Sequence, residues 1–415
     1  MPAGFPPGVG RRFLLAYAAL FVPFAITTPY LQKLLALRGF APDRIGLILG
    51  CFEAMAVVAP PVWGYLSDRT HRPRLILGLC IAAGAPVFAL FNWVQGFPAA
   101  LAVAVLFGLF YRSLIPLTDG ITFRFIHRHG GDYGRIRIGG SMGFIACMLL
   151  VEPLGLGSSR DGALIIAAVV GACLLHLLSV GLLPTAGAAP EAGDAGARTC
   201  RGGGAGGAES VPHEGLLQAL RAIAQPAFVW FTLCVFLCRV AMMAYYGFFT
   251  LYLANDLGIQ AAGFIWLLGP LSEIPIIYWS RPIMARIGVR NLFALGLVGV
   301  AVRLGGFSLA EGLWAVIPLQ FLHSLTFGAY HCASVTYVSR VVPPRLQSTA
   351  QTLFAGITVG GGMMVGGALG GMVARQAGFR PMFAAAAVLA VLTLGLLLWK
   401  VPRLDAVRRG GNAQR

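Results

Sequence analysis

The stretch GYLSDRTHRPR (residues 64–74) decides the fold of this chain. It is a short basic break between two long apolar runs, at about residues 44–66 and 73–93. Short positively charged connections between apolar runs are typical of the cytoplasmic loops of membrane proteins. We therefore expect a cytoplasmic loop between two transmembrane helices at this position.

The composition places the chain in a bilayer. Its 415 residues are 58% hydrophobic and only 11% charged, with a mean hydropathy of +0.79. A soluble core could not bury so much apolar surface. The net charge of +16 would indicate a nucleic-acid partner in a soluble protein, but most basic residues here lie in short breaks between apolar runs. We expect a lipid bilayer around the chain and no nucleic-acid partner.

Twelve apolar stretches are long enough to cross a bilayer, which takes about 20 residues in a helix. They cover residues 12–37, 44–66, 73–93, 97–126, 136–157, 160–183, 226–254, 258–279, 289–309, 312–341, 346–374 and 379–400. The sequence therefore predicts an all-α membrane protein with twelve transmembrane helices.

A polar, Gly/Ala-rich segment at residues 184–215 divides these stretches into two sets of six. Such a segment cannot bury apolar area, so we expect a flexible cytoplasmic linker. The expected domains are a six-helix bundle at residues 1–183 and a second at 216–415. Residues 280–290 follow the eighth apolar run, the second run of the second set, just as residues 64–74 follow the second run of the first set. They lack the aspartate of residues 64–74. This weaker copy predicts two pseudo-symmetric bundles about an axis along the membrane normal.

The distribution of basic residues predicts the orientation. With both termini cytoplasmic, about twenty basic residues fall on the cytoplasmic side and only about six outside. The six are Lys33, Arg38, Arg44, Arg160, Arg375 and Arg380. We expect a multi-pass protein of the bacterial inner membrane that acts as a monomer.

Nothing in the sequence favours an enzyme. The eight cysteines have no zinc or disulfide spacing, so neither a metal nor a cofactor is expected. Residues 139–143 fit the serine-hydrolase pattern G-x-S-x-G but open a transmembrane stretch with no strand before it. Residues 202–207 fit G-x-G-x-x-G inside the low-complexity linker. By contrast, the glycines of residues 356–371 have the spacing that lets helix backbones approach closely.

Ionisable residues within the apolar stretches are the candidates for function. Each costs several kcal/mol in a bilayer unless it is paired or faces water. They are Glu53, Arg112, Asp119, Arg239, Glu273, Arg303, His323 and His331. Some could form structural ion pairs, for example Glu273 with Arg303, but buried ion pairs stabilise poorly and apolar packing would serve as well. The set therefore indicates a polar pathway.

Spacing relates some of these residues to each other. Three pairs lie seven residues apart, two turns along one helix face: Arg112 with Asp119, Arg239 with Tyr246, and Trp266 with Glu273. Gln320, His323 and Phe327 form a polar stripe, with His331 angled modestly away. We expect this stripe to face a cavity.

Residues 64–74 resemble the loop after the second helix of the major facilitator superfamily of membrane transporters. The likeness rests on the order glycine, aspartate, arginine and further basic residues. In that family the loop braces a cytoplasmic gate, its aspartate holding neighbouring helix ends. The resemblance implies a gate role for Gly64, Asp68, Arg69 and Arg72.

Further motifs resemble the phenylpropionate permease family of proton-coupled transporters, which is related to lactose permease and to nucleoside proton symporters. They are PLTD at 116–119, DYGRIR at 132–137, AYYG at 244–247 and QFLH at 320–323, in that order along both halves. The resemblance implies import of a small organic compound, for the namesake an aromatic carboxylate, together with a proton.

Two departures from these relatives affect the site. The placement of Glu273, Arg303 and His323 is similar to the proton-coupling set of lactose permease, but residues 324–326 lack that protein's further glutamate. Glu273 and Asp119 are therefore both candidates for the proton carrier. Arg112 stands where an uncharged residue is expected, so it either pairs with Asp119 or alters substrate choice.

The hypothesis is a secondary active transporter that takes up a small organic solute, plausibly an aromatic or other carboxylate, with protons by alternating access. Export of drugs or metabolites, and symport of a neutral sugar or nucleoside, stay open as alternatives. The residues expected to handle the proton are Asp119, Glu273, Arg303 and His323. Those expected to contact the substrate are Arg112, Arg239, Tyr246, Trp266, His323 and His331.

Overall fold

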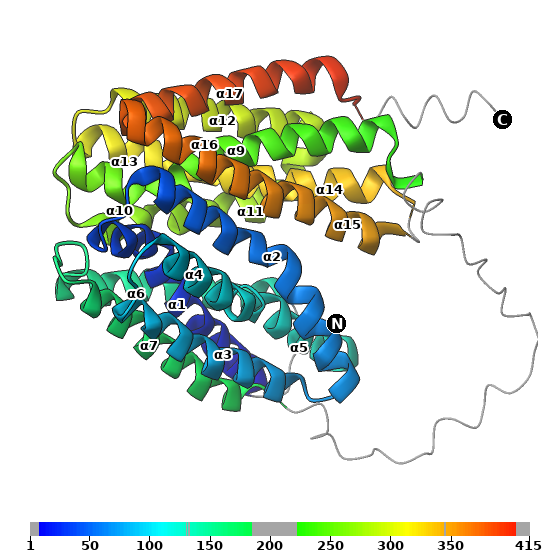
Figure 1. The fold of residues 1–415 in the computed structure, drawn as a ribbon. Coiled ribbons are helices and arrows are strands. Elements are labelled where there is room, and N and C mark those ends of the chain that lie inside the picture. The colour runs from blue at the N-terminus through cyan, green and yellow to red at the C-terminus, as the bar shows by residue number, and fades with distance from the viewer. Residues whose placement is uncertain (1–7, 130, 132, 185–221, 344–345, 404–415) are drawn as a thin grey trace, which may run out of the picture.

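The computed structural model describes residues 8–129, 131, 133–184, 222–343 and 346–403. Its helices form two bundles that lie side by side (Figure 1). The first bundle contains α1 (Val9–Leu37), α2 (Pro42–Thr70), α3 (Pro73–Ala89), α4 (Phe97–Tyr111), α5 (Leu114–His129), α6 (Tyr133–Val151) and α7 (Gly162–Ser179), with short 3-10 turns η1 (Leu90–Asn92), η2 (Glu152–Leu154) and η3 (Val180–Leu182).

The second bundle contains α9 to α17. Its elements are α9 (Pro226–Asn255), α10 (Ala262–Trp266), α11 (Leu268–Ile287), α12 (Val289–Leu309), α13 (Leu313–Phe321), the π-helical turn η4 (Ser324–Ala329), α14 (Tyr330–Val341), α15 (Gln347–Ala355), the π-helical turn η6 (Gly356–Gly361), α16 (Gly362–Ala377) and α17 (Phe379–Lys400). The expected linker at 184–215 lies almost entirely outside the described residues.

The predicted membrane-spanning fold is confirmed. Eleven helical segments of the described residues are long and apolar enough to cross a membrane. The remaining expected span, at residues 312–341, is also helical and consists of α13, η4 and α14.

Two further expected spans are divided at points that prolines explain. A proline lacks the N–H that would bond the carbonyl four residues earlier. Pro116 follows the break between α4 and α5 at Arg112, and Pro270 follows the break between α10 and α11 at Leu267. The missing bond divides each of these spans into two helical segments.

The stretch at residues 64–74 is more helical than expected. Residues 64–70 form the last turns of α2, and Pro73 opens α3, so the connection is only His71 and Arg72. His71 ends α2 in the left-handed region, with φ of 53°. In the second bundle Gly288, with φ of 82°, turns the chain between α11 and α12 at the corresponding place.

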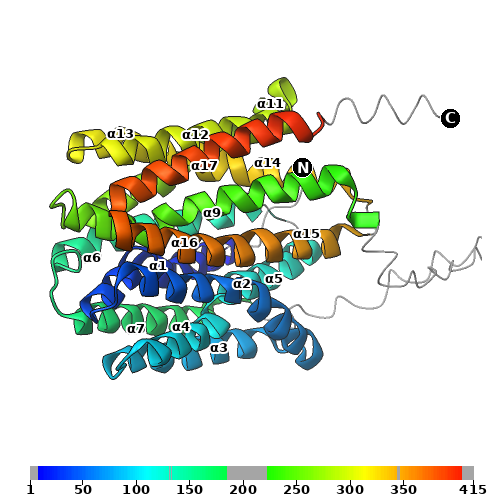
Figure 2. The same cartoon turned by 45° about the horizontal axis from the view of Figure 1, so that its top comes forward.

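Helix α16 packs closely against helices of both bundles, as the glycine spacing predicted. Figure 2 shows α16 between α9 and α2. A Cβ atom on Gly367 would overlap the backbone of Gly46, and one on Gly366 would overlap the backbone of Val240. Glycine at these positions allows backbones to touch across the two bundles.

Hydrogen bonds between the bundles gather at the end where residues 38–41 join α1 to α2, which we call the far end. Gln32 Nε2 donates to the Tyr246 carbonyl at 3.2 Å, and Gln32 Oε1 accepts from the Thr250 N–H at 3.1 Å. Arg375 Nη1 lies 2.7 Å from Asp43 Oδ2. The far end is therefore closed in this structure.

Glu152 adds a buried contact to this closure. It follows α6 in the first bundle, and its carboxylate accepts from the Tyr30 hydroxyl and, at 3.0 Å, from the N–H of Gly263 in the second bundle. Lys33 donates nearby to the carbonyls of Leu156 and Gly157. At the opposite, near end, where α1 begins and α17 ends, the Asp68–Arg124 ion pair joins α2 to α5 within one bundle.

The close contact of α2 with α16 leads to a first prediction. Gly46→Val places methyl groups where the Gly367 carbonyl lies, and overpacking of this kind typically costs about 1–3 kcal/mol. The variant should therefore disfavour far-end closure. We expect a cysteine introduced at Thr28 in a cysteine-free background to react several-fold faster with an impermeant maleimide added from the far side.

Gly171→Val in α7 is the matched control, because a Cβ there meets no atom within 4 Å. Its labelling rate should equal that of the parent. Unchanged labelling of the Gly46→Val protein would show that the α2–α16 contact does not control closure.

Candidate functional site

A cavity of about 300 Å³ lies between the two bundles. The first bundle lines it with Phe24, Thr27, Thr28, Leu31, Leu49, Phe52, Glu53, Tyr111 and Arg112, and the second with Arg239, Met243, Tyr246, Phe327, His331, Val359 and Met363. Apolar and aromatic walls with a few polar groups are typical of small-molecule sites. Four of the predicted substrate contacts, namely Arg112, Arg239, Tyr246 and His331, line this cavity.

Arg112 pairs with Glu53 across the first-bundle wall. The two side chains form an ion pair and are less than one-fifth exposed. The Arg112 guanidinium also lies 5.4 Å from the centroid of the Phe52 ring. The suggested pairing of Arg112 with Asp119 is wrong, because Arg112 pairs with Glu53 and the Asp119 carboxylate is bonded to the hydroxyls of Tyr17 and Tyr133.

Arg239 brings a positive charge to the second-bundle wall. Its guanidinium carbon lies 4.8 Å from the centroid of the Tyr330 ring. Among the described residues no carboxylate pairs with it, and neither its Nε nor the Tyr330 hydroxyl has a hydrogen-bond partner. The two walls together therefore carry one uncompensated positive charge.

Asp119 lies away from this cavity, in a pair of tyrosine contacts. Its Oδ1 accepts from the Tyr17 hydroxyl at 2.5 Å and from the Tyr133 hydroxyl at 2.9 Å. The Tyr17 hydroxyl oxygen also lies 3.2 Å from Thr122 Oγ1. Asp119 thus connects α1, α5 and the start of α6, and it is not among the residues that line the cavity.

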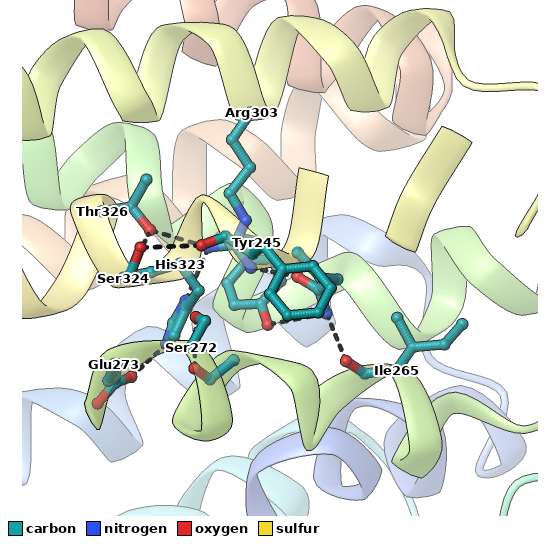
Figure 3. A network of polar contacts seen from close by, with 11 residues as sticks. Tyr245, Ile265, Ser272, Glu273, Arg303, His323, Ser324 and Thr326 are labelled. Carbon is teal, nitrogen blue, oxygen red and sulfur yellow. Dashed lines mark hydrogen bonds and ion pairs between the residues drawn. The ribbon is translucent and has the colours of Figure 1, made fainter. Parts of the chain in front are cut away.

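A polar network fills the second bundle around Arg303 (Figure 3). Arg303 is fully buried, and its guanidinium lies 4.0 Å from the centroid of the Tyr245 ring. It donates to Thr326 Oγ1 at 2.9 Å and to Gln320 Oε1, whose amide donates to the Ile265 carbonyl at 2.9 Å. The charge is therefore held by polar and aromatic groups.

His323 connects Arg303 to Glu273. Its Nδ1 lies 2.8 Å from Arg303 Nη1, and its Nε2 lies 2.8 Å from Glu273 Oε1. Arginine can only donate, so Nδ1 must accept and the proton of a neutral imidazole is on Nε2, facing the carboxylate. The expected contact between Glu273 and Arg303 is thus mediated by the histidine. A second proton on His323 would break its bond to Arg303.

Stacked rings join this network to the cavity. The ring centroids of His323 and Phe327 lie 5.8 Å apart, and those of Phe327 and His331 lie 5.7 Å apart, with interplanar angles of 6° and 4°. Phe327 and His331 line the cavity. The expected angle between His331 and the stripe is absent because the π-helical turn η4 changes the helix period. The three rings form a continuous column.

Trp266 lies outside the cavity. Its indole N–H donates to Thr250 Oγ1 at 3.0 Å, and its ring packs on Tyr245, with centroids 4.7 Å apart. It ends α10, whereas Glu273 is in α11 and contacts His323. The structure thus places Trp266 in the wall behind the network.

The gate residues lie on the near end of the first bundle. Asp68 Oδ1 is 3.0 Å from Arg124 Nη1, which ties the last turn of α2 to α5. Arg69 and Arg72 are exposed, and a Cβ on Gly64 would meet no atom within 4 Å. Asp68 therefore connects the last turn of α2 to α5, and its role in a gate stays a prediction.

Sequence reasoning missed the polar contacts at the far end. Glu152 falls inside the expected span 136–157. It is therefore an ionisable residue within an apolar stretch, the criterion by which the other candidates were chosen. Gln32 lies in the first expected span and is almost fully buried. As a neutral residue, Gln32 gave no comparable indication. The hydroxyls of Thr27 and Tyr111 on the cavity wall were also not anticipated.

Two bundles of membrane-spanning helices around a cavity, with buried charges facing it, define a membrane transporter. A family model described as "MFS_1 like family" matches residues 12–385. The chain belongs to this family, which confirms the resemblance to the major facilitator superfamily.

Curated proteins and solved structures agree with this assignment. The Probable 3-phenylpropionic acid transporter of Escherichia coli (strain K12) is 28% identical over 369 residues, which cover 86% of this chain and 88% of that protein. The Maltose permease of Geobacillus stearothermophilus is 27% identical over 382 residues, which cover 89% and 90%. The crystal structure of nucleoside transporter NupG superposes with a TM-score of 0.77 at 18% identity and covers 94% of this chain and 98% of that one. The chain is a transporter and not an enzyme.

Proposed function

We propose that the protein imports a small aromatic carboxylate together with protons, by alternating access to the cavity between its bundles. The observation that carries this proposal is Arg239, which faces the cavity without a carboxylate partner among the described residues. A guanidinium keeps its charge and can grip a carboxylate through two parallel hydrogen bonds. Its free Nε is one of the donors that such a bond needs.

The apolar part of the cavity lining suits an aromatic ring of the substrate. Phe24, Phe52, Tyr246 and Phe327 line the cavity together with aliphatic side chains. Aromatic rings gain from contact with other rings beyond the area that they bury. A monoanion with a ring would neutralise Arg239 and fill the apolar part of the site.

For proton handling we propose the chain Glu273, His323 and Arg303, with Asp119 as a second carboxyl. A substrate that presses on Phe327 would shift the stacked column and with it His323. Since the His323–Arg303 contact requires an unprotonated Nδ1, moving the histidine changes which group holds the proton. The π-helical turn η4 is a natural place for such movement.

We further propose that the near end is cytoplasmic, with residues 184–215 as the linker between domains 1–183 and 216–415. The protein would act as a monomer in a bacterial inner membrane. Because the far end is closed in this structure, the cavity would then open to the cytoplasm. Asp68, with Gly64, Arg69 and Arg72, would control closure of that side.

Two alternatives have their own support. A neutral sugar is favoured by the likeness to the Maltose permease, and it would use the Glu53–Arg112 pair without engaging Arg239. Export uses the same fold and cavity, since direction depends on the gradient and the order of binding. Binding and flux measurements separate these cases.

Arg239→Gln tests the proposed substrate class. Loss of the charge that pairs with a carboxylate should weaken binding of 3-phenylpropanoate by about 10- to 100-fold, since charge-assisted hydrogen bonds are worth roughly 1.5–3 kcal/mol. Isothermal titration calorimetry on the purified protein measures this change.

Arg340→Gln, an exposed arginine of α14, serves as the control and should bind as the parent does. Equal carboxylate binding by the Arg239→Gln protein, or binding of maltose but of no carboxylate, would support the neutral-sugar alternative instead.

Glu273→Gln tests proton coupling. The amide can still contact His323 but cannot carry the proton, so uphill uptake driven by a pH gradient in proteoliposomes should fall to near the level without a gradient. Exchange of labelled for unlabelled substrate at equal pH should persist, because it needs no net proton movement. Full gradient-driven accumulation would remove Glu273 from the coupling machinery.

Asp68→Ala tests the gate. Exposed ion pairs contribute only about 0–1 kcal/mol, so the protein should stay folded and its substrate Kd should not change. We expect uptake to slow several-fold because α2 is no longer tied to α5. Glu311→Ala, at an exposed acid between α12 and α13, should transport at the parental rate. Lost binding in the Asp68 variant would place this residue in the site rather than the gate.

A further inference from the structure

The first-bundle wall of the cavity carries polar groups that no ligand contact yet explains. We call Thr27, Glu53, Tyr111 and Arg112 the neutral polar wall, because the charges of Glu53 and Arg112 cancel. Thr27 and Tyr111 are 3% and 2% exposed; their hydroxyls interact with each other, and neither side-chain oxygen has a further hydrogen-bond partner among the described residues. Buried hydroxyls are normally bonded, so these two point to a missing partner.

We infer that the cavity selects monocarboxylates that carry a hydroxyl group at the end remote from the carboxylate. This inference rests on the proposed function and adds the chemistry of the substrate's other end. The carboxylate would bind Arg239 on the second-bundle wall, and the hydroxyl would face the neutral polar wall of the first bundle.

Charge decides which polar group fits this wall. A second carboxylate would meet Glu53, and an ammonium would meet Arg112, so either charged group is opposed by one member of the pair. A hydroxyl is neutral, and it both donates and accepts. It can donate to the carboxylate oxygen of Glu53 that Arg112 leaves free, and accept from Arg112, Tyr111 or Thr27.

Loss of water from the neutral polar wall is the reason that the cavity should prefer a hydroxylated substrate. An unsubstituted ring pressed against the neutral polar wall would displace water and leave buried polar groups without partners. Each such group loses its hydrogen bonds to water without replacement, which disfavours binding. A hydroxyl restores the bonds, and sites built to bond a substrate hydroxyl discriminate strongly against analogues that lack it.

The test compares two ligands that differ by one hydroxyl, 3-phenylpropanoate and 3-(4-hydroxyphenyl)propanoate. Calorimetry on the purified full-length protein should give a Kd about tenfold lower for the hydroxylated acid. Tyr111→Phe and Thr27→Val, both close to isosteric, should each reduce this ratio toward one. Tyr337→Phe is the matched control: its hydroxyl bonds the Pro402 carbonyl away from the cavity, so the ratio should stay as in the parent.

A dicarboxylate tests whether the neutral polar wall rejects a second charged group. The parent protein should bind 3-(4-carboxyphenyl)propanoate more weakly than 3-phenylpropanoate, and Glu53→Gln should relieve this bias, since it leaves Arg112 free for the second carboxylate. Together with the hydroxyl ratio, this reports on the wall even where one variant folds poorly.

The outcomes separate the inference from the function on which it rests. Equal Kd values for the hydroxylated and unsubstituted acids, or a ratio unchanged in both Tyr111→Phe and Thr27→Val, would overturn the inference while leaving carboxylate transport standing. Failure of every carboxylate to bind would overturn the proposed function itself.

Discussion

A buried guanidinium is the constraint around which the second bundle is built. Arg303 has no exposed surface, and a bare charge there would cost several kcal/mol. Four residues are its partners: Tyr245 from α9, Gln320 from α13, His323 just before η4 and Thr326 within η4. Gly269 of α11 adds space, since a Cβ there would press on the His323 ring. The charge thereby fixes how these helices meet.

The fold was predictable because it depends on properties that are local in sequence. Apolar length predicted the spans, and glycine spacing predicted the close contact that Gly367 makes with Gly46. The failures occurred where a helix changes its period. Pro116 and Pro270 divide two spans, and Arg112 pairs with Glu53 on another helix rather than with Asp119 seven residues on. The π-helical turn η4 had the opposite effect, bringing His331 into line with His323.

The site was predictable in part for a related reason. Charged residues in apolar spans indicate a pathway whatever their partners, so Arg239 and His331 were expected in the cavity that they line. Partner choice is a property of the packed bundle, and the pairing of Arg112 with Glu53, on α2, could not be read from α4 alone. Neutral groups such as Gln32 and Tyr111 cost less to bury, and their roles appear only when their neighbours are known.

Tyr246 joins the separate parts of the molecule. Its carbonyl accepts from Gln32 at the closed far end, and its side chain lines the cavity. Its ring centroid also lies 6.5 Å from that of His323, which contacts Glu273 in the polar network around Arg303. A ligand that moves this one residue would therefore disturb both the contact between bundles and the histidine. Alternating access needs a coupling of this kind, in which occupancy of the cavity changes the stability of the closed end.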